Sequence, residues 1–203
     1  MHAEIKKKLL DQIQIHFDLV KCEINSESII TGGCINKCIC WDIGVLKLLI
    51  KSNSKFKYPN MFDKEKTGLD ILRKSNSIRV PKVYFTIDVN DTSFIVMEFI
   101  EPSAMSEDFW KEFAIKLSKL HKCSNHSFGL EHDNYIGSLV QLNRYKDSWS
   151  EFFIEQRLQP QIKFAYDNCL LHKNEINQFE KAYKLFDHIF HLEPPALLHG
   201  DLW

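Results

Sequence analysis

Apolar side chains recur at a helical spacing near the start of the chain, with lysines between them. They stand four residues apart: Ile5, Leu9, Ile13 and Phe17. Positions separated by three or four residues lie on one side of an α-helix. The pattern therefore predicts an amphipathic helix over residues 3–17, with its apolar side toward a core.

After this helix the chain contains runs of β-branched and apolar residues. These runs occupy residues 28–51 and are interrupted at Gly32 and Gly33 and again at Gly44. Short apolar runs bounded by glycine are typical of strands joined by turns. We expect three strands and two turns here, which would begin an antiparallel sheet.

A second helix and a further hairpin complete the expected sheet region. Residues 58–74 carry apolar side chains on one side of a helix, with charged residues between them. Strands are then predicted at residues 80–85 and 92–100, on either side of Asn90 and Asp91, which favour a tight turn. The predicted order is helix, three strands, helix, two strands.

The rest of the chain has an almost entirely helical pattern, so we expect a boundary near residue 101. Three helices and one short buried strand are predicted, at residues 106–122, 145–172, 174–191 and 196–198. The predicted fold class is α+β, with a sheet lobe over residues 1–100 and a helical lobe over residues 101–203. A small antiparallel sheet with one inserted helix, followed by helices, is the arrangement of the protein-kinase-like fold.

Composition and charge argue against several classes of function. The 203 residues include 26 lysines and arginines and 27 acidic residues, so no net positive field would attract nucleic acid or an anionic membrane. No apolar run approaches the roughly 20 residues that cross a bilayer. The six cysteines follow no signal peptide, so we expect reduced thiols in a cytoplasmic protein. Neither nucleic-acid nor membrane partners are expected.

Two glycines and an ion pair are candidates for phosphate binding. Gly32 and Gly33 lie between the first two strands, where backbone N–H groups can approach phosphate oxygens without a Cβ clash. Taken alone, this segment favours a plain glycine-rich turn. Lys51 ends the third strand and Glu65 lies on the next helix, the order in which such side chains pair in kinases. The alternative is two solvated charges, because other lysines lie nearby: Lys47 and Lys64.

Two further candidates follow the last strand of the sheet lobe and the last helix. In a kinase-like lobe, backbone groups at the end of the last strand bind adenine; here they belong to Glu98, Phe99 and Ile100. His199-Gly200-Asp201 follows the short predicted strand, and a carboxylate held there can orient a hydroxyl and accept its proton. Asp201 is therefore the candidate catalytic residue.

These motifs together resemble the fructosamine 3-kinase family, over essentially the whole chain. The segment from His199 to Trp203 is similar to the start of the family's signature. A second block, at residues 128–143 and continuing to Trp149 and Arg157, is similar to the family's stretch between the lobes. The glycine loop, the strand lysine and the helix glutamate also stand where the family has them.

The resemblance implies ATP-dependent phosphorylation of the sugar O3 of fructosamines or ribulosamines, on small amines or glycated lysines. It implies that Asp201 accepts the proton, and it places substrate contacts at Gln141, Asn143 and Trp203. A loop-fixing role for Gln141 and Asn143, and simple packing of the indole, remain open alternatives. Two rival functions are an aminoglycoside phosphotransferase-like activity and nucleotide binding without catalysis.

The glycine loop and the metal sites raise two further expectations. Some family members carry a redox-sensitive cysteine in this loop, so Cys34 is a candidate for linking two chains into a homodimer, and a buried, inert thiol is the alternative. Cys34, Cys38 and Cys40 lack a second Cys or His pair at zinc spacing, so no metal site is predicted there. In the family, Mg²⁺ ligands follow the signature; we expect them beyond residue 203 and expect these 203 residues alone to be inactive.

Overall fold

The computed structural model describes residues 2–32 and 35–200 and confirms the α+β class. The chain divides into two compact units, Met1–Lys111 and Glu112–Trp203. The division falls within helix α3 (Phe109–His121). The lobe boundary near residue 101, which was predicted from the change to a helical pattern, stays a prediction.

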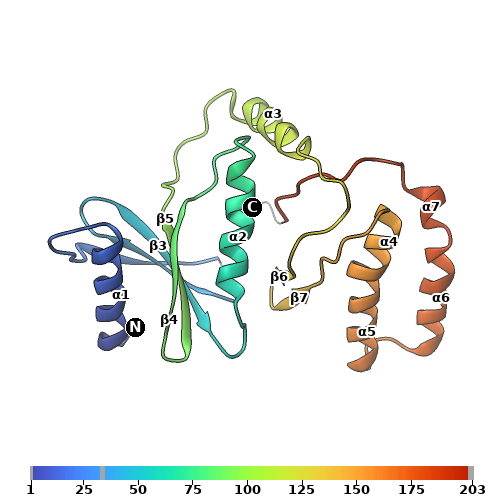
Figure 1. Cartoon of the computed structure of the whole chain (residues 1–203), viewed down its shortest axis with the longest axis horizontal. Coiled ribbons are helices and arrows are strands. Elements are labelled where there is room, and N and C mark those ends of the chain that lie inside the picture. Colours follow the sequence, from blue (N-terminus) through green and yellow to red (C-terminus); the bar gives the residue numbers. More distant parts are fainter. Residues whose placement is uncertain (1, 33–34, 201–203) are drawn as a thin grey trace. The chain divides into compact units, whose positions relative to one another are not determined.

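The first unit is built on a five-stranded antiparallel sheet (Figure 1). Its strands, in spatial order, are β1 (Ser26–Ile30), β2 (Lys37–Asp42), β3 (Lys47–Ser54), β5 (Thr92–Glu98) and β4 (Val83–Val89). The hairpin between β4 and β5 turns at Asn90, which has a positive φ of 54°. Asparagine tolerates this left-handed conformation better than most residues. The predicted three strands, helix and two strands are therefore confirmed.

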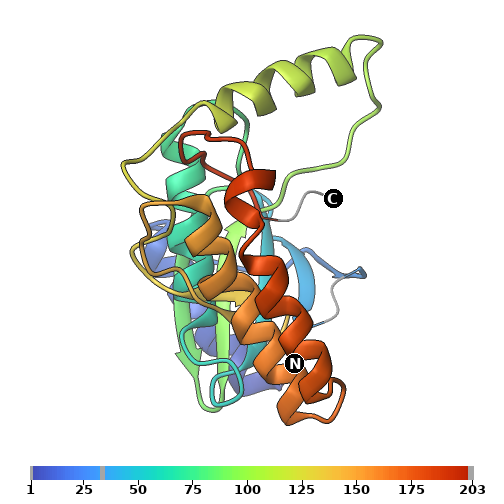
Figure 2. The same cartoon turned by 90° about the vertical axis from the view of Figure 1, so that its right-hand side faces the viewer.

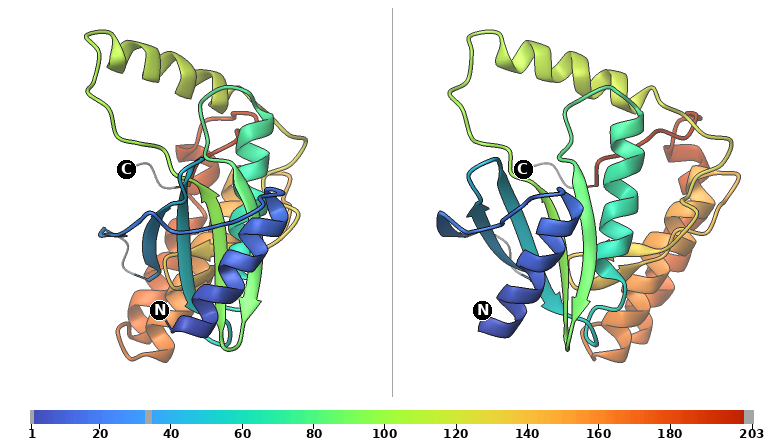
Figure 3. Two further views of the ribbon diagram at one scale, coloured as in Figure 1. Left: turned by 90° about the vertical axis from the view of Figure 1, so that its left-hand side faces the viewer. Right: turned by 60° about the vertical axis from the view of Figure 1, so that its left-hand side comes forward.

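Two helices cover the two faces of this sheet (Figure 3). Helix α1 (Ala3–His16) buries Leu9 and Ile13 against a cluster that includes Leu48 and Ile50 of β3. Helix α2 (Met61–Lys74) packs Phe62 on the opposite face, against alternate residues of β5 and β4. Successive side chains of a strand point to opposite faces, so β3, β4 and β5 contribute residues to both cores.

The second unit combines a small hairpin with two helical arms that run side by side (Figure 2). The hairpin pairs β6 (Asn134–Ile136) with β7 (Leu139–Gln141), and the predictions did not include it. One arm contains α4 (Trp149–Phe153), a π-helical turn (Ile154–Leu158) and α5 (Gln159–Asp167). The other contains α6 (Lys173–Tyr183) and α7 (Phe186–Ile189).

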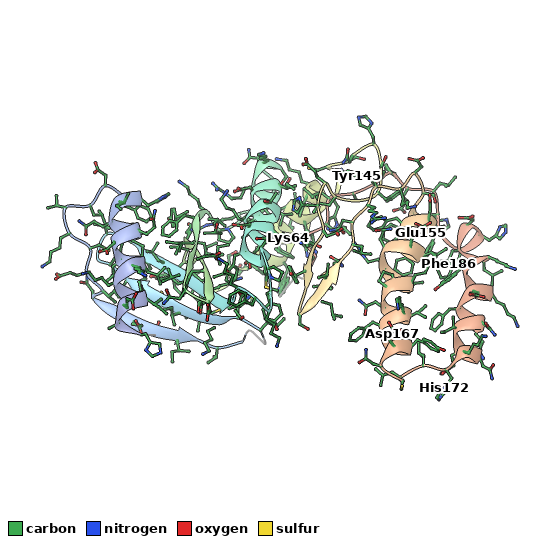
Figure 4. All side chains as sticks on the ribbon, turned by 60° about the horizontal axis from the view of Figure 1, so that its bottom comes forward. Lys64, Tyr145, Glu155, Asp167, His172 and Phe186 are labelled. Atoms are coloured by element: carbon green, nitrogen blue, oxygen red, sulfur yellow. The ribbon has the colours of Figure 1, made fainter. Side chains whose placement is uncertain are left out.

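Aromatic rings hold the two arms together. Phe153 lies 6.0 Å from Phe186 and 5.7 Å from Phe190, measured between ring centroids. Trp149 stacks on Phe153 at 5.5 Å. Such pairs add stability beyond the apolar area they bury. Figure 4 shows Phe186 and Glu155 on the facing arms.

The predicted buried strand at residues 196–198 is wrong. Ala196 forms a single bridge with Ser124, and Leu198 is 58% exposed. Ser124 lies three residues after the end of α3, and its pairing with Ala196 is an isolated bridge outside the named strands. In the ranges that the structure describes, no helix is long and apolar enough to cross a membrane.

Candidate functional site

Lys51 and Glu65 form an ion pair between the sheet and α2, as predicted. Lys51 Nζ lies 2.6 Å from Glu65 Oε1, and the two side chains are 26% and 24% exposed. The pair is thus partly withdrawn from water, where a charge–charge attraction is stronger than on an open surface. Enough of each side chain remains accessible to meet a ligand.

Strand and helix periodicity together place this pair. Lys51 lies next to Ile95 of β5 in the sheet register, and Ile95 packs in the cluster under α2. On α2, Phe62 and Leu69 pack in the same cluster, and Glu65 stands between them at helical spacing. Residues separated by three and four positions share a helix face, so the carboxylate points toward the sheet.

The two neighbouring lysines differ from Lys51 in their surroundings. Lys47, the first residue of β3, is exposed, as predicted, and forms an ion pair with Glu101. Lys64, labelled on α2 in Figure 4, is half-buried, whereas we predicted that it points to solvent. The residue type alone therefore did not predict the exposure of Lys64.

Only part of the loop between β1 and β2, which is the predicted phosphate cradle, lies within the described residues. Gly32 has a φ of 123°, and a Cβ atom added there would meet nothing within 4 Å. Asn36 fixes the far end of the loop, because its Oδ1 accepts a hydrogen bond from Asn53 Nδ2 at 3.0 Å. Gly33 and Cys34 lie outside the described residues, so the cradle and the redox role of Cys34 stay predictions.

The end of β5 leaves one backbone donor available. The Glu98 N–H donates to Lys82 O at 2.8 Å, and the Phe99 N–H donates to Lys47 O at 3.3 Å. The Ile100 N–H has no hydrogen-bond partner among the described residues, and Ile100 is 36% exposed. This donor has the chemistry that an adenine ring nitrogen requires, and adenine binding stays a prediction.

The carboxylate of Glu98 has a structural task at this position. It accepts hydrogen bonds from Arg79 Nη2 at 2.6 Å and from the Lys82 N–H at 3.1 Å. The bond from Arg79 is the main cause that lowers the pKa of Glu98. The side chain therefore fastens the end of β5, and only backbone groups remain for a nucleotide.

Asn143 is the centre of a polar network in the second unit. It is 4% exposed, its Nδ2 donates to His132 O at 3.1 Å and to Asn134 Oδ1 at 2.9 Å, and its Oδ1 accepts from Arg157 Nη2 at 2.8 Å. Arg157 also lies 4.6 Å over the Phe152 ring, and burial lowers the pKa of its guanidinium group. Since its side-chain amide is fully used, the geometry favours the loop-fixing alternative for Asn143.

The remaining predicted contacts are not brought together by the described residues. Gln141 lies half-buried on β7. Asp201 and Trp203 lie outside the described residues. His199 and Gly200, the first two residues of the motif, are described, and Gly200 has a φ of 89°, which favours glycine.

The described cysteines are all free thiols: Cys22, Cys38, Cys40, Cys123 and Cys169. Burial is the main cause that raises the pKa of Cys38, which pairs in register with Lys51. A raised pKa keeps a thiol protonated and slow to react. Within the described part of the chain, no group of three or more histidine, cysteine or acidic side chains could hold a metal ion.

A cavity of about 480 Å³ lies beside the first turn of α2 but does not include Lys51 or Glu65. Its polar side chains bond to one another. Thr86 donates to Asp63 at 2.6 Å, and Asp88 accepts from Ser93 at 2.7 Å. We therefore leave this cavity outside the candidate site.

The fructosamine kinase family model matches residues 4–203 of the chain. A protein-ribulosamine 3-kinase of Oryza sativa subsp. japonica is 35% identical over 188 residues, which are 89% of this chain. A "probable ketoamine kinase" of Vibrio cholerae is 30% identical over 205 residues, which are all of this chain. A crystal structure from Haemophilus somnus 129PT, with a provisional fructosamine-3-kinase name, superimposes with a TM-score of 0.84 at 26% identity over 96% of this chain.

This chain matches only part of each relative. It covers 54% of the rice protein, 68% of the Vibrio protein and 65% of the Haemophilus chain. The predicted resemblance and the kinase-like fold are confirmed across the matched region.

Proposed function

The chain belongs to the fructosamine kinase family, and on this premise we propose that the protein transfers the γ-phosphoryl group of ATP to the sugar O3 of fructosamines or ribulosamines. The acceptors would be small amines or glycated lysines. The relatives' names support this class of substrate: protein-ribulosamine 3-kinase and ketoamine kinase.

The Lys51–Glu65 ion pair is the observation that carries the proposal. Lys51 Nζ is held 2.6 Å from Glu65 Oε1, so the ammonium group is fixed before a nucleotide arrives. A fixed positive charge stabilises the charge of a transferring phosphoryl group without first reorganising. Gly32 N–H and the free Ile100 N–H lie in the same unit, and their donors suit phosphate and adenine respectively.

In the proposed reaction the sugar O3 attacks the γ-phosphorus. A bond forms between O3 and phosphorus, the bond between the γ-phosphorus and the β,γ-bridging oxygen breaks, and ADP leaves with that oxygen. The O3 proton passes to Asp201, the candidate base. Mg²⁺, when bound, would neutralise phosphate charge, but the described residues identify no ligands for it, so we assign none.

We expect the protein, purified as its organism produces it, to release ADP from ATP only when a fructosamine or ribulosamine acceptor is present. Fructoselysine and ribuloselysine peptides would be compared with kanamycin and with buffer in a coupled ADP assay. Nucleotide binding without release of ADP, whichever acceptor is added, would support a binding module instead. A preference for kanamycin would overturn the proposed substrate class in favour of an aminoglycoside phosphotransferase-like activity.

A further inference from the structure

Two histidine rings stack at the junction between α3 and the segment that ends in Gly200. His121 is the last residue of α3, and His199 is two residues before Asp201. Their ring centroids lie 5.8 Å apart with an interplanar angle of 23°. Both side chains are half-buried. The contact joins residues that are far apart in the sequence.

Two hydrogen bonds attach the same segment to the residues that follow α3. The Leu197 N–H donates to Cys123 O at 2.8 Å, and Ser124 Oγ donates to Pro195 O at 2.7 Å. In Figure 1 the red segment after α7 returns to this end of α3. The hydrogen bonds fix residues 195–197, whereas Leu198 is exposed. Beyond Leu197, the His121–His199 stack is thus the next contact that restrains the segment.

The stack holds by ring contact rather than by hydrogen bonding. His121 Nε2 and His199 Nδ1 are buried, and neither has a hydrogen-bond partner in the described ranges. A buried polar nitrogen without a partner lowers stability, so a phenyl ring at position 121 would keep the contact and avoid that cost. Substitution can therefore separate the ring contact of His121 from the loss of stability caused by its unpaired nitrogen.

We propose that His121 is a positioning residue: its ring, stacked on His199, holds the segment from which Asp201 acts. This proposal rests on the proposed function, because it assigns Asp201 as the proton acceptor. Gly200 has a φ of 89°, a conformation that glycine adopts with little strain. The His121–His199 contact therefore restrains the chain two residues before the candidate base in the sequence.

The kinetic test compares His121→Ala with His121→Phe. We expect His121→Ala to lower kcat roughly 10- to 100-fold, because small displacements of a reacting group cost that much, while KM for ATP stays within about twofold. His121→Phe should restore kcat to within about threefold of the wild-type value. The control is His126→Ala, which alters an exposed histidine of the same unit that takes no part in the stack.

An amide-exchange measurement tests the positioning without using activity. Hydrogen exchange, followed by mass spectrometry, should accelerate in His121→Ala for the peptide that covers residues 195–200 and stay unchanged for peptides of the β-sheet. Unchanged exchange in that peptide would overturn the proposal, as would a kcat in His121→Phe as low as in His121→Ala. If the wild-type protein has no kinase activity, the proposed function fails, and the exchange result alone decides whether His121 restrains the segment.

Discussion

Replacing Lys51 with methionine is expected to lower kcat/KM for ATP about 100-fold or more, since one electrostatic donor aimed at developing charge contributes on that scale. Methionine keeps the unbranched stem in the sheet but removes the ammonium group that Glu65 holds at 2.6 Å. Glu65→Gln should have a smaller effect in the same direction, because it keeps the positive charge of Lys51 but holds the ammonium group less firmly in position. Steady-state ADP release at varied ATP concentration measures both.

Lys47→Met is the matched control for this experiment. Lys47 lies on the same strand, is exposed, and pairs with Glu101 rather than with α2. Its removal should change kcat/KM by less than about threefold, since exposed ion pairs contribute little. Equal losses in Lys47→Met and Lys51→Met would mean that the partly buried Lys51–Glu65 pair has no special role in nucleotide use. Circular dichroism of each variant separates a loss of function from a loss of fold.

Gly129→Ala is expected to destabilise the second unit by roughly 2–4 kcal/mol, the range of backbone strain combined with a steric clash. Gly129 has a φ of 143°, and an added Cβ would lie 2.8 Å from Asn143 O and 2.9 Å from Tyr145 Cα. Asn143 O also accepts the Leu130 N–H at 2.9 Å. Relief of the clash would therefore pull apart the backbone pairing on which the Asn143 network depends.

The opposite result is expected for Gly68→Ala, which serves as the control. Gly68 lies within α2, and a Cβ atom there would meet nothing within 4 Å. Alanine in a helix interior is favoured over glycine by about 0.5–1 kcal/mol, so stability should rise slightly. Urea denaturation, read by far-UV circular dichroism and by exchange in each unit, measures both variants. A Gly129→Ala protein as stable as wild type would contradict the close approach of these backbones.

The Lys51–Glu65 pair could be predicted from the sequence because it depends on two short-range periodicities. Strand alternation places Lys51 on the α2 side of β3, and helical spacing places Glu65 on the sheet side of α2. The order of the elements and the β4–β5 turn were predictable for similar local reasons. These features need no knowledge of distant contacts.

The role of Asn143 and the stack of His121 on His199 could not be predicted in this way. Asn143 is buried because Arg157, which lies fourteen residues later on a π-helical turn, completes its hydrogen bonds. His121 and His199 are far apart in the sequence and are brought together by the fold of the second unit, so no local pattern indicates their contact. The exposure of Leu198 has a similar origin, since apolar sequence at residues 196–198 indicates a strand but does not supply a neighbouring strand to pair with.

The position of the phosphate in the product shows directly whether the sugar O3 is the acceptor. The protein would be incubated with ATP and fructoselysine, and the product examined by phosphorus–proton correlation NMR. We expect the phosphorus to couple to the single proton on C3 of the sugar, because O3 is the proposed attacking oxygen. Coupling to protons on any other carbon, or a sugar that carries no phosphate after ATP has been consumed, would contradict it.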